Sequence, residues 1–240
     1  AMDWRVNVGV LVLLIVLVLS LAAVMAFLLV PLALEKGGHG GKTLQLTYFV
    51  AIGLGYILVE IAFIQRFVLF LGHPTYALTV VVFLMLLSSG IGSMLSRRWL
   101  ARPETRRIPL AIIMVVILAY VFLLPGILTS LVGLPFAAKL VISGVLLAPL
   151  GIAMGMPFPT GLHALSSSGS GGGGKHSIEW AWAMNAAASV LGSVLAMVIA
   201  IRFGLNVTLA CGAVAYAVAM LTALPGFFRR AVRPLETVSA

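Results

Sequence analysis

Long runs of apolar residues dominate this chain, and they limit what it can fold into. A helix that crosses a bilayer needs roughly 20 mainly apolar residues. Seven segments meet that length: 8–34, 44–71, 76–96, 108–130, 136–165, 178–201 and 206–227. Of the 240 residues, 62% are hydrophobic and 9% are charged, whereas a water-soluble domain is about a quarter charged. The sequence therefore predicts a polytopic membrane protein.

Helices are the only secondary structure that suits these segments. Open sheet edges cannot lie in hydrocarbon, and the runs lack the period-two alternation of barrel strands. We therefore predict an all-α bundle of about seven transmembrane helices, forming one domain over residues 1–240. Pro125-Gly126 should interrupt the fourth segment, prolines within 151–161 should break the fifth, and the Gly/Ser-rich stretch 166–174 should be a flexible linker.

Basic residues predict the orientation. With seven crossings, eleven of the 15 Lys and Arg residues fall on one side: Lys36, Lys42, Arg97, Arg98, Arg102, Arg106, Arg107, Lys175, Arg229, Arg230 and Arg233. Arg5, Arg66, Lys139 and Arg202 fall on the other. The basic side faces the cytosol, so we expect the N-terminus outside and the C-terminus in the cytosol. This rule accounts for the net charge of +9 without a nucleic-acid partner.

Glu60 is the main candidate for function. It lies sixteen residues from both Leu44 and Tyr76, which is about 24 Å along a helix and well inside the hydrocarbon. An ionisable group at that depth marks a functional site by default. The alternative is a structural carboxylate bonded to a neighbouring helix. Tyr56, one turn earlier, shares the face of Glu60.

Further candidates follow toward the outer end of the same segment. Gln65 and Arg66 could contact a ligand, although Arg66 could also simply extend to the interface. Pro74 should end the helix at the preceding residue. His73 and Tyr76, in this turn, could bind a ligand, or His73 could meet interfacial water in a plain hairpin.

A third group of candidates lies toward the cytosolic side. Pro157 and Thr160 belong to the broken fifth segment, and broken helices line binding sites in transporters. Glu179 and Trp182 open the sixth segment, where anchoring at the interface is the competing interpretation. Asn185 is expected to be buried about 10 Å into that helix and to need a polar partner.

Two helix faces carry small residues at every fourth position. They are Ser88-Gly92-Ser96 and Ala188-Gly192-Ala196. Such faces let helices approach closely in a membrane, so both are predicted to be packing surfaces.

No pattern for a metal or nucleotide cofactor occurs, and none is expected. The only aspartate is Asp3, which excludes a Ser-His-Asp set within these residues. Glu60, His73 and Glu179 could act as acids or bases, but they are expected at three different depths. Activity as an enzyme on its own is therefore disfavoured.

Four stretches resemble the C-terminal membrane region of large bacterial proteins described as spermidine synthase-like. They are 48–76, 89–98, 155–161 and 180–189. The resemblance implies a bundle similar to half of a major-facilitator transporter. In that family a Rossmann-like domain of the aminopropyltransferase type precedes the membrane region. No part of these residues matches that domain, so none of its substrate sites carries over.

Three functional hypotheses remain open. The first is a module that binds or translocates a small polar or amphipathic solute, together with a partner domain or subunit. The second is a non-catalytic anchor or scaffold in a larger membrane complex. The third is the membrane part of a transferase. The expected partners are membrane lipid, a small-molecule solute, and another membrane subunit or a second copy of the chain.

Overall fold

The computed structural model describes residues 4–26, 40–99, 103–168 and 173–223. Throughout this part the secondary structure is helical, which confirms the all-α prediction. The helices are α1 (Trp4–Val24), α3 (Gly40–Leu71), α4 (Pro74–Trp99), a 3₁₀ helix (Pro103–Arg107), α5 (Ile108–Ser130), α6 (Phe136–Met154), α7 (Pro157–Ser168), α8 (Gly173–Phe203) and α9 (Leu205–Thr222). Six helical stretches are long and apolar enough to cross a membrane, and α1 adds an apolar stretch at Leu11–Ala22.

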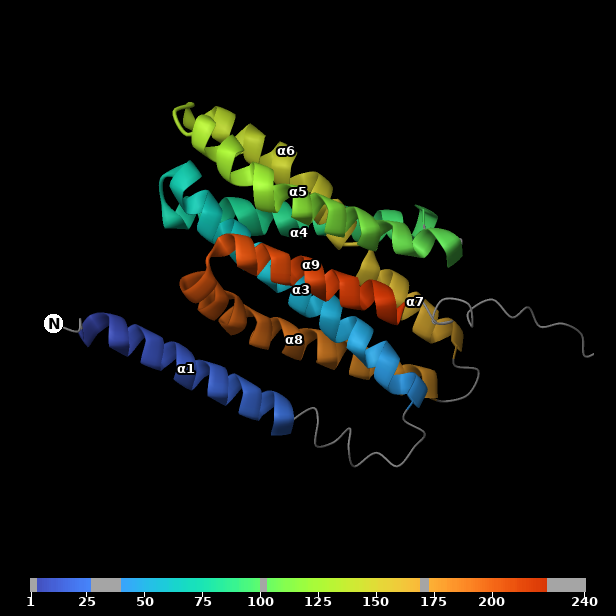
Figure 1. Ribbon diagram of the computed structural model, residues 1–240. Coiled ribbons are helices and arrows are strands. Elements are labelled where there is room, and N and C mark those ends of the chain that lie inside the picture. The colour runs from blue at the N-terminus through green and yellow to red at the C-terminus, as the bar shows by residue number, and fades with distance from the viewer. Residues whose placement is uncertain (1–3, 27–39, 100–102, 169–172, 224–240) are drawn as a thin grey trace, which may run out of the picture.

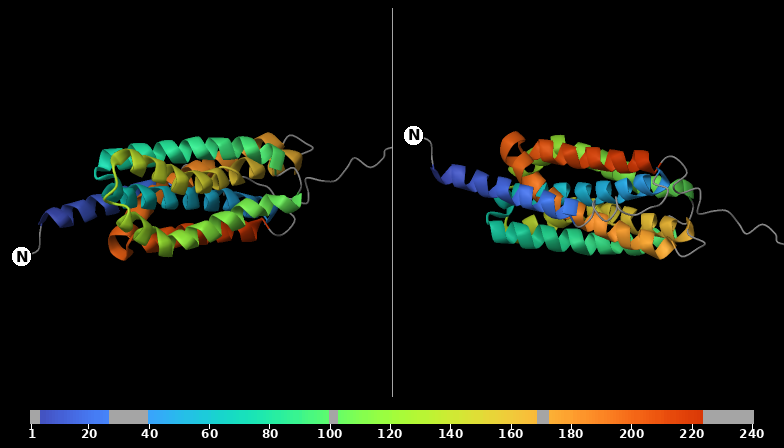
Figure 2. Two further views of the ribbon diagram at one scale, coloured as in Figure 1. Left: turned by 90° about the horizontal axis from the view of Figure 1, so that it is seen from above. Right: turned by 90° about the horizontal axis from the view of Figure 1, so that it is seen from below.

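The helices form an up-and-down bundle (Figures 1 and 2). Helices α3, α5 and α8 run one way, and α4, α6–α7 and α9 run the other. Short connections at Gly72–His73, 131–135 and Gly204 define what we call the hairpin end. Helix α1 packs along α8 at the edge of the bundle.

Helix α3 is the centre of the bundle, because α8, α9 and α4 all pack against it. Its apolar stretch is 61% buried, against 22–44% for the other five spans. Glycines make this close packing possible. A Cβ atom at Gly53 would lie 2.6 Å from Oδ1 of Asn185 on α8, and one at Gly55 would lie 2.9 Å from the Tyr216 ring on α9.

Both small-residue faces are confirmed as packing surfaces. A Cβ atom at Gly92 of α4 would lie 1.9 Å from the carbonyl oxygen of Ile152 on α6. One at Gly192 of α8 would lie 2.3 Å from Ile57 of α3. These positions therefore hold α4 against α6 and α8 against α3.

The two predicted breaks in the spans have different outcomes. The fifth segment is broken as predicted, because α6 ends at Met154 and α7 begins at Pro157. The predicted interruption at Pro125-Gly126 is wrong, because α5 continues to Ser130. Pro125 removes one backbone donor, the one toward the Val121 carbonyl, and a membrane helix can continue past such a single loss.

Several predicted boundaries also change. Helix α7 extends through Ser168 and α8 begins at Gly173, so both ends of the expected linker 166–174 are helical, and 169–172 lie outside the described residues. The turn before Pro74 is confirmed, with Gly72 at φ 84°, a conformation that favours glycine. The predicted ends of the first and last segments, at 34 and 227, also lie outside the described residues.

Replacing Gly92 with alanine should separate α4 from α6. The added methyl group meets backbone rather than a flexible side chain, so we expect a loss of about 1–3 kcal/mol in unfolding free energy. Gly90→Ala is the matched control, because nothing lies within 4 Å of its Cβ position. It should be neutral or stabilising by up to about 1 kcal/mol. Reversible unfolding in detergent measures both, and equal effects would contradict this packing.

Candidate functional site

Glu60 is a largely buried residue in the middle of α3. The residue is 9% exposed, and its carboxyl group makes no hydrogen bond or ion pair within the described ranges. A buried structural carboxylate is normally paired or hydrogen-bonded. The fold therefore leaves this group available for a partner outside the described chain.

Helical geometry places Glu60 between two neighbouring helices. Gly53 faces Asn185 on α8, and Tyr56 faces Ser89 on α4. At 3.6 residues per turn, Glu60 points roughly 20° from the direction of Gly53 and roughly 40° from that of Tyr56. Its side chain consequently projects between α4 and α8, on the face shared with Tyr56.

A second polar group without a partner lies one turn from Glu60. The Tyr56 hydroxyl is buried and forms no well-formed hydrogen bond. Ser89 and Glu60 are close enough to interact with it electrostatically. The Ser89 hydroxyl donates to the Leu86 carbonyl at 3.1 Å and keeps lone pairs that face Tyr56 as acceptors.

Asn185 of α8 adds an amide beside the turn of α3 that precedes Tyr56. It is half-buried, so the expectation of a fully buried residue is wrong, and it lies against Gly53. Its backbone carbonyl accepts the Ser189 hydroxyl at 3.0 Å, whereas no hydrogen bond of its side chain occurs among the described residues. We call Tyr56, Glu60, Ser89 and Asn185 the central polar cluster.

The break between α6 and α7 reaches this cluster at Ser89, because a Cβ atom at Gly155 would meet the Ser89 backbone. The Tyr48 hydroxyl donates to the Pro157 carbonyl at 2.8 Å, and Tyr48 precedes Glu60 by twelve residues, or about 18 Å along α3. The Thr160 hydroxyl donates to the Met156 carbonyl at 2.7 Å. Pro157 therefore attaches α7 to α3 toward the end opposite the hairpin end, whereas the Thr160 hydroxyl bonds only to the turn that precedes α7.

Trp182 and Glu179 lie toward that same end. Trp182 is 56% exposed, and its ring packs edge to face on Phe158 with centroids 4.6 Å apart. Glu179 is exposed. Their positions agree better with anchoring than with contact to a ligand at Glu60.

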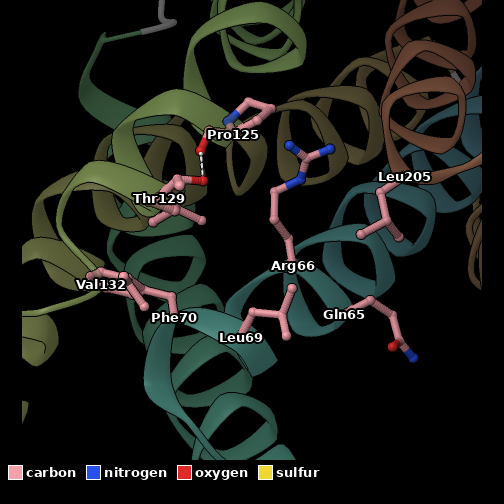
Figure 3. A pocket seen from close by; sticks show the side chains of 9 residues that line it. Gln65, Arg66, Leu69, Phe70, Pro125, Thr129, Val132 and Leu205 are labelled. Atoms are coloured by element: carbon pink, nitrogen blue, oxygen red, sulfur yellow. Dashed lines mark hydrogen bonds between the residues drawn. The ribbon is translucent and has the colours of Figure 1, made fainter.

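A pocket of about 370 Å³ opens at the hairpin end of the bundle, beside Arg66 (Figure 3). We call it the Arg66 pocket. Besides Gln65 and Arg66 it is lined by Leu69, Phe70, Pro125, Leu128, Thr129, Val132 and Leu205. The Gln65 amide turns away from the guanidinium and lies 3.9 Å from the sulfur of Met197. Arg66 is thus the polar group that defines the pocket.

Asn206 of α9 positions the Arg66 side chain. An Nη atom of Arg66 donates to Oδ1 of Asn206, while its Nε is buried without a hydrogen-bond partner. Sequence reasoning overlooked Asn206 and Ser89. Asn206 could have been found from the order of the spans. It follows the hairpin at Gly204, so it should lie at the same depth as Arg66.

His73 and Tyr76 do not line this pocket. Both are exposed, and Nδ1 of His73 accepts the Thr75 backbone N–H at 3.2 Å. The rings of His73 and Tyr76 lie 5.6 Å apart, and Tyr76 lies 5.2 Å from Phe136 of α6. Together they form an aromatic group on the hairpin between α3 and α4.

The described residues hold no group of three or more His, Cys, Asp or Glu side chains that could bind a metal. Comparison with known proteins gives no match: no family profile, no curated protein and no solved structure matches this chain.

Replacing Tyr48 with phenylalanine should weaken the attachment of α7 to α3. The change removes a buried hydrogen bond to the Pro157 carbonyl, so we expect a loss of about 0.5–1.5 kcal/mol in unfolding free energy. Tyr76→Phe is the control, because Tyr76 is exposed. The expectation fails if both variants unfold at the wild-type midpoint.

Proposed function

We propose that this chain is an integral membrane module that binds or translocates a small polar or amphipathic solute at the central polar cluster. The observation that carries the proposal is Glu60, a largely buried residue that helix geometry places between α4 and α8 and whose carboxyl group has no polar partner in the described residues. Burial of such a group in hydrocarbon costs a few kcal/mol. A bound solute with N–H or O–H donors would offset that cost.

The neighbours of Glu60 support a solute with several polar groups. Tyr56 contributes a buried hydroxyl. Asn185 of α8 contributes an amide that lies beside Gly53, one turn before Tyr56 on α3. A carboxyl, a hydroxyl and an amide on three successive levels can bind several donors or acceptors along one molecule. The solute class is therefore a small molecule that carries hydrogen-bond donors or a positive charge.

A partner domain or subunit is part of the proposal. The number of spans and the resemblance to half of a major-facilitator transporter both favour a second half that completes the path. We place the module in a bacterial inner membrane. Arg97, Arg98, Arg106 and Arg107 lie at the end opposite the hairpin end, and the positive-inside rule supports a cytosolic location for it.

Glu60→Gln should abolish binding of the solute, because it removes the negative charge while preserving the shape of the side chain. We expect native mass spectrometry of the chain, gently extracted from its own membranes, to reveal a bound small molecule. That mass should disappear in the variant. Glu179→Gln, at an exposed position, is the control and should retain the ligand.

Two outcomes would contradict the proposal. One is a ligand mass that persists unchanged in Glu60→Gln. The other is a stoichiometric protein partner with no small molecule in the wild type, which would favour the scaffold function.

A further inference from the structure

We propose that the Arg66 pocket binds an amphipathic anion, with its carboxylate or phosphate head on Arg66 and one apolar chain in the pocket. This deepens the proposed function by naming a ligand class. It rests on different residues, because neither Glu60 nor any other member of the central polar cluster lines the pocket.

The first argument is the charge of Arg66. Glu60 and Glu179 are the acidic residues whose side chains are described, and neither forms an ion pair with Arg66. Glu60 is six positions away on α3 and does not share its face. Glu104 and Glu179 lie toward the opposite end of the bundle. The guanidinium is therefore without a counter-charge in this part of the chain.

The second argument is how the guanidinium is held. A guanidinium has five N–H donors in a fixed fork, and the bond to Asn206 uses one side of it. The buried Nε is unpartnered. In Figure 3 the side chain extends between Pro125 and Thr129 on one side and Leu205 on the other. Fixed, incompletely bonded guanidinium groups are suited to carboxylates and phosphates.

The third argument is the apolar lining. Leu69, Phe70, Leu128, Val132 and Leu205 supply most of the wall around the single charge. Such a wall favours an apolar chain over a fully hydrated ion. At about 370 Å³ the pocket is at the small end for ligand sites, so it fits one chain. Its place at the hairpin end suits a molecule with its head at the membrane surface.

Decanoate is a suitable probe, because it has one short chain and an anionic head. The full chain in phosphatidylcholine nanodiscs is titrated with decanoate, and native mass spectrometry counts the bound molecules. We expect one decanoate per wild-type chain and at least about tenfold weaker binding in Arg66→Gln, since a charged hydrogen-bond partner is lost. Decyltrimethylammonium, with the same chain length and opposite charge, should not bind.

Thr129→Phe keeps the test decisive if Arg66→Gln fails to fold. Thr129 is exposed on α5, where its hydroxyl bonds only within its own helix, so the larger ring should fill the pocket and leave the Arg66–Asn206 contact intact. It should also weaken decanoate binding about tenfold. Arg202→Gln, at an exposed position near the same end, should bind normally. Normal decanoate binding by Thr129→Phe, or equal binding of the cationic probe, overturns the proposal.

Two further measurements identify the source of the ligand and distinguish the Arg66 pocket from the central polar cluster. If phosphatidylglycerol in the nanodiscs competes with decanoate, the anionic head group that binds Arg66 comes from a bilayer phospholipid. If phosphatidylglycerol does not compete, the ligand is a free amphiphile. Both results support an anion site. Glu60→Gln should bind decanoate like the wild type. Failure at Arg66 therefore leaves the Glu60 proposal standing, and failure at Glu60 leaves the Arg66 proposal standing.

Discussion

The close packing of α3 against its neighbours is the contact on which the rest of the structure depends. Lipid tails are as apolar as leucine, so membrane helices associate through shape and small residues rather than through the hydrophobic effect. Gly53 and Gly55 let α8 and α9 approach the α3 backbone. This approach converts an ordinary apolar helix into the buried centre of the bundle. Tyr56, Glu60 and Arg66 of α3 are consequently buried or half-buried against neighbouring helices.

Two polar regions follow from this position of α3. Glu60 faces the space between α4 and α8, where Tyr56 is also left without a well-formed hydrogen bond. One and a half turns farther, Arg66 faces α9 and contacts Asn206. The first region carries a carboxyl group and the second a guanidinium, each without an ion-pair partner in the described chain. The module thus presents an acidic and a basic group at two positions along one helix, and these suit different ligand groups.

Much of this could be predicted from the residues, and the failures have physical causes. Glu60 stands out because a charge interrupts an apolar run, and the break near Pro157 follows from the loss of backbone donors. Pro125 misled the prediction because a membrane helix can continue past the loss of a single backbone donor. Pro157 and Thr160 shared a hypothesis with Glu60; Pro157 is bonded to Tyr48, twelve residues before Glu60 on α3, while Gly155 of the same break packs against Ser89 of the central polar cluster.

The sequence by itself determined the all-α class, the approximate extent of each span and the depth of each polar residue, because these depend on local hydropathy and backbone chemistry. Only the tertiary structure decided which polar groups meet. Gly53 lies against Asn185, and Arg66 contacts Asn206 from 140 positions away. Hydropathy fixes how far along a helix a residue lies, but not which neighbour that face will meet. That choice depends on the fit of small side chains across helices far apart in the chain.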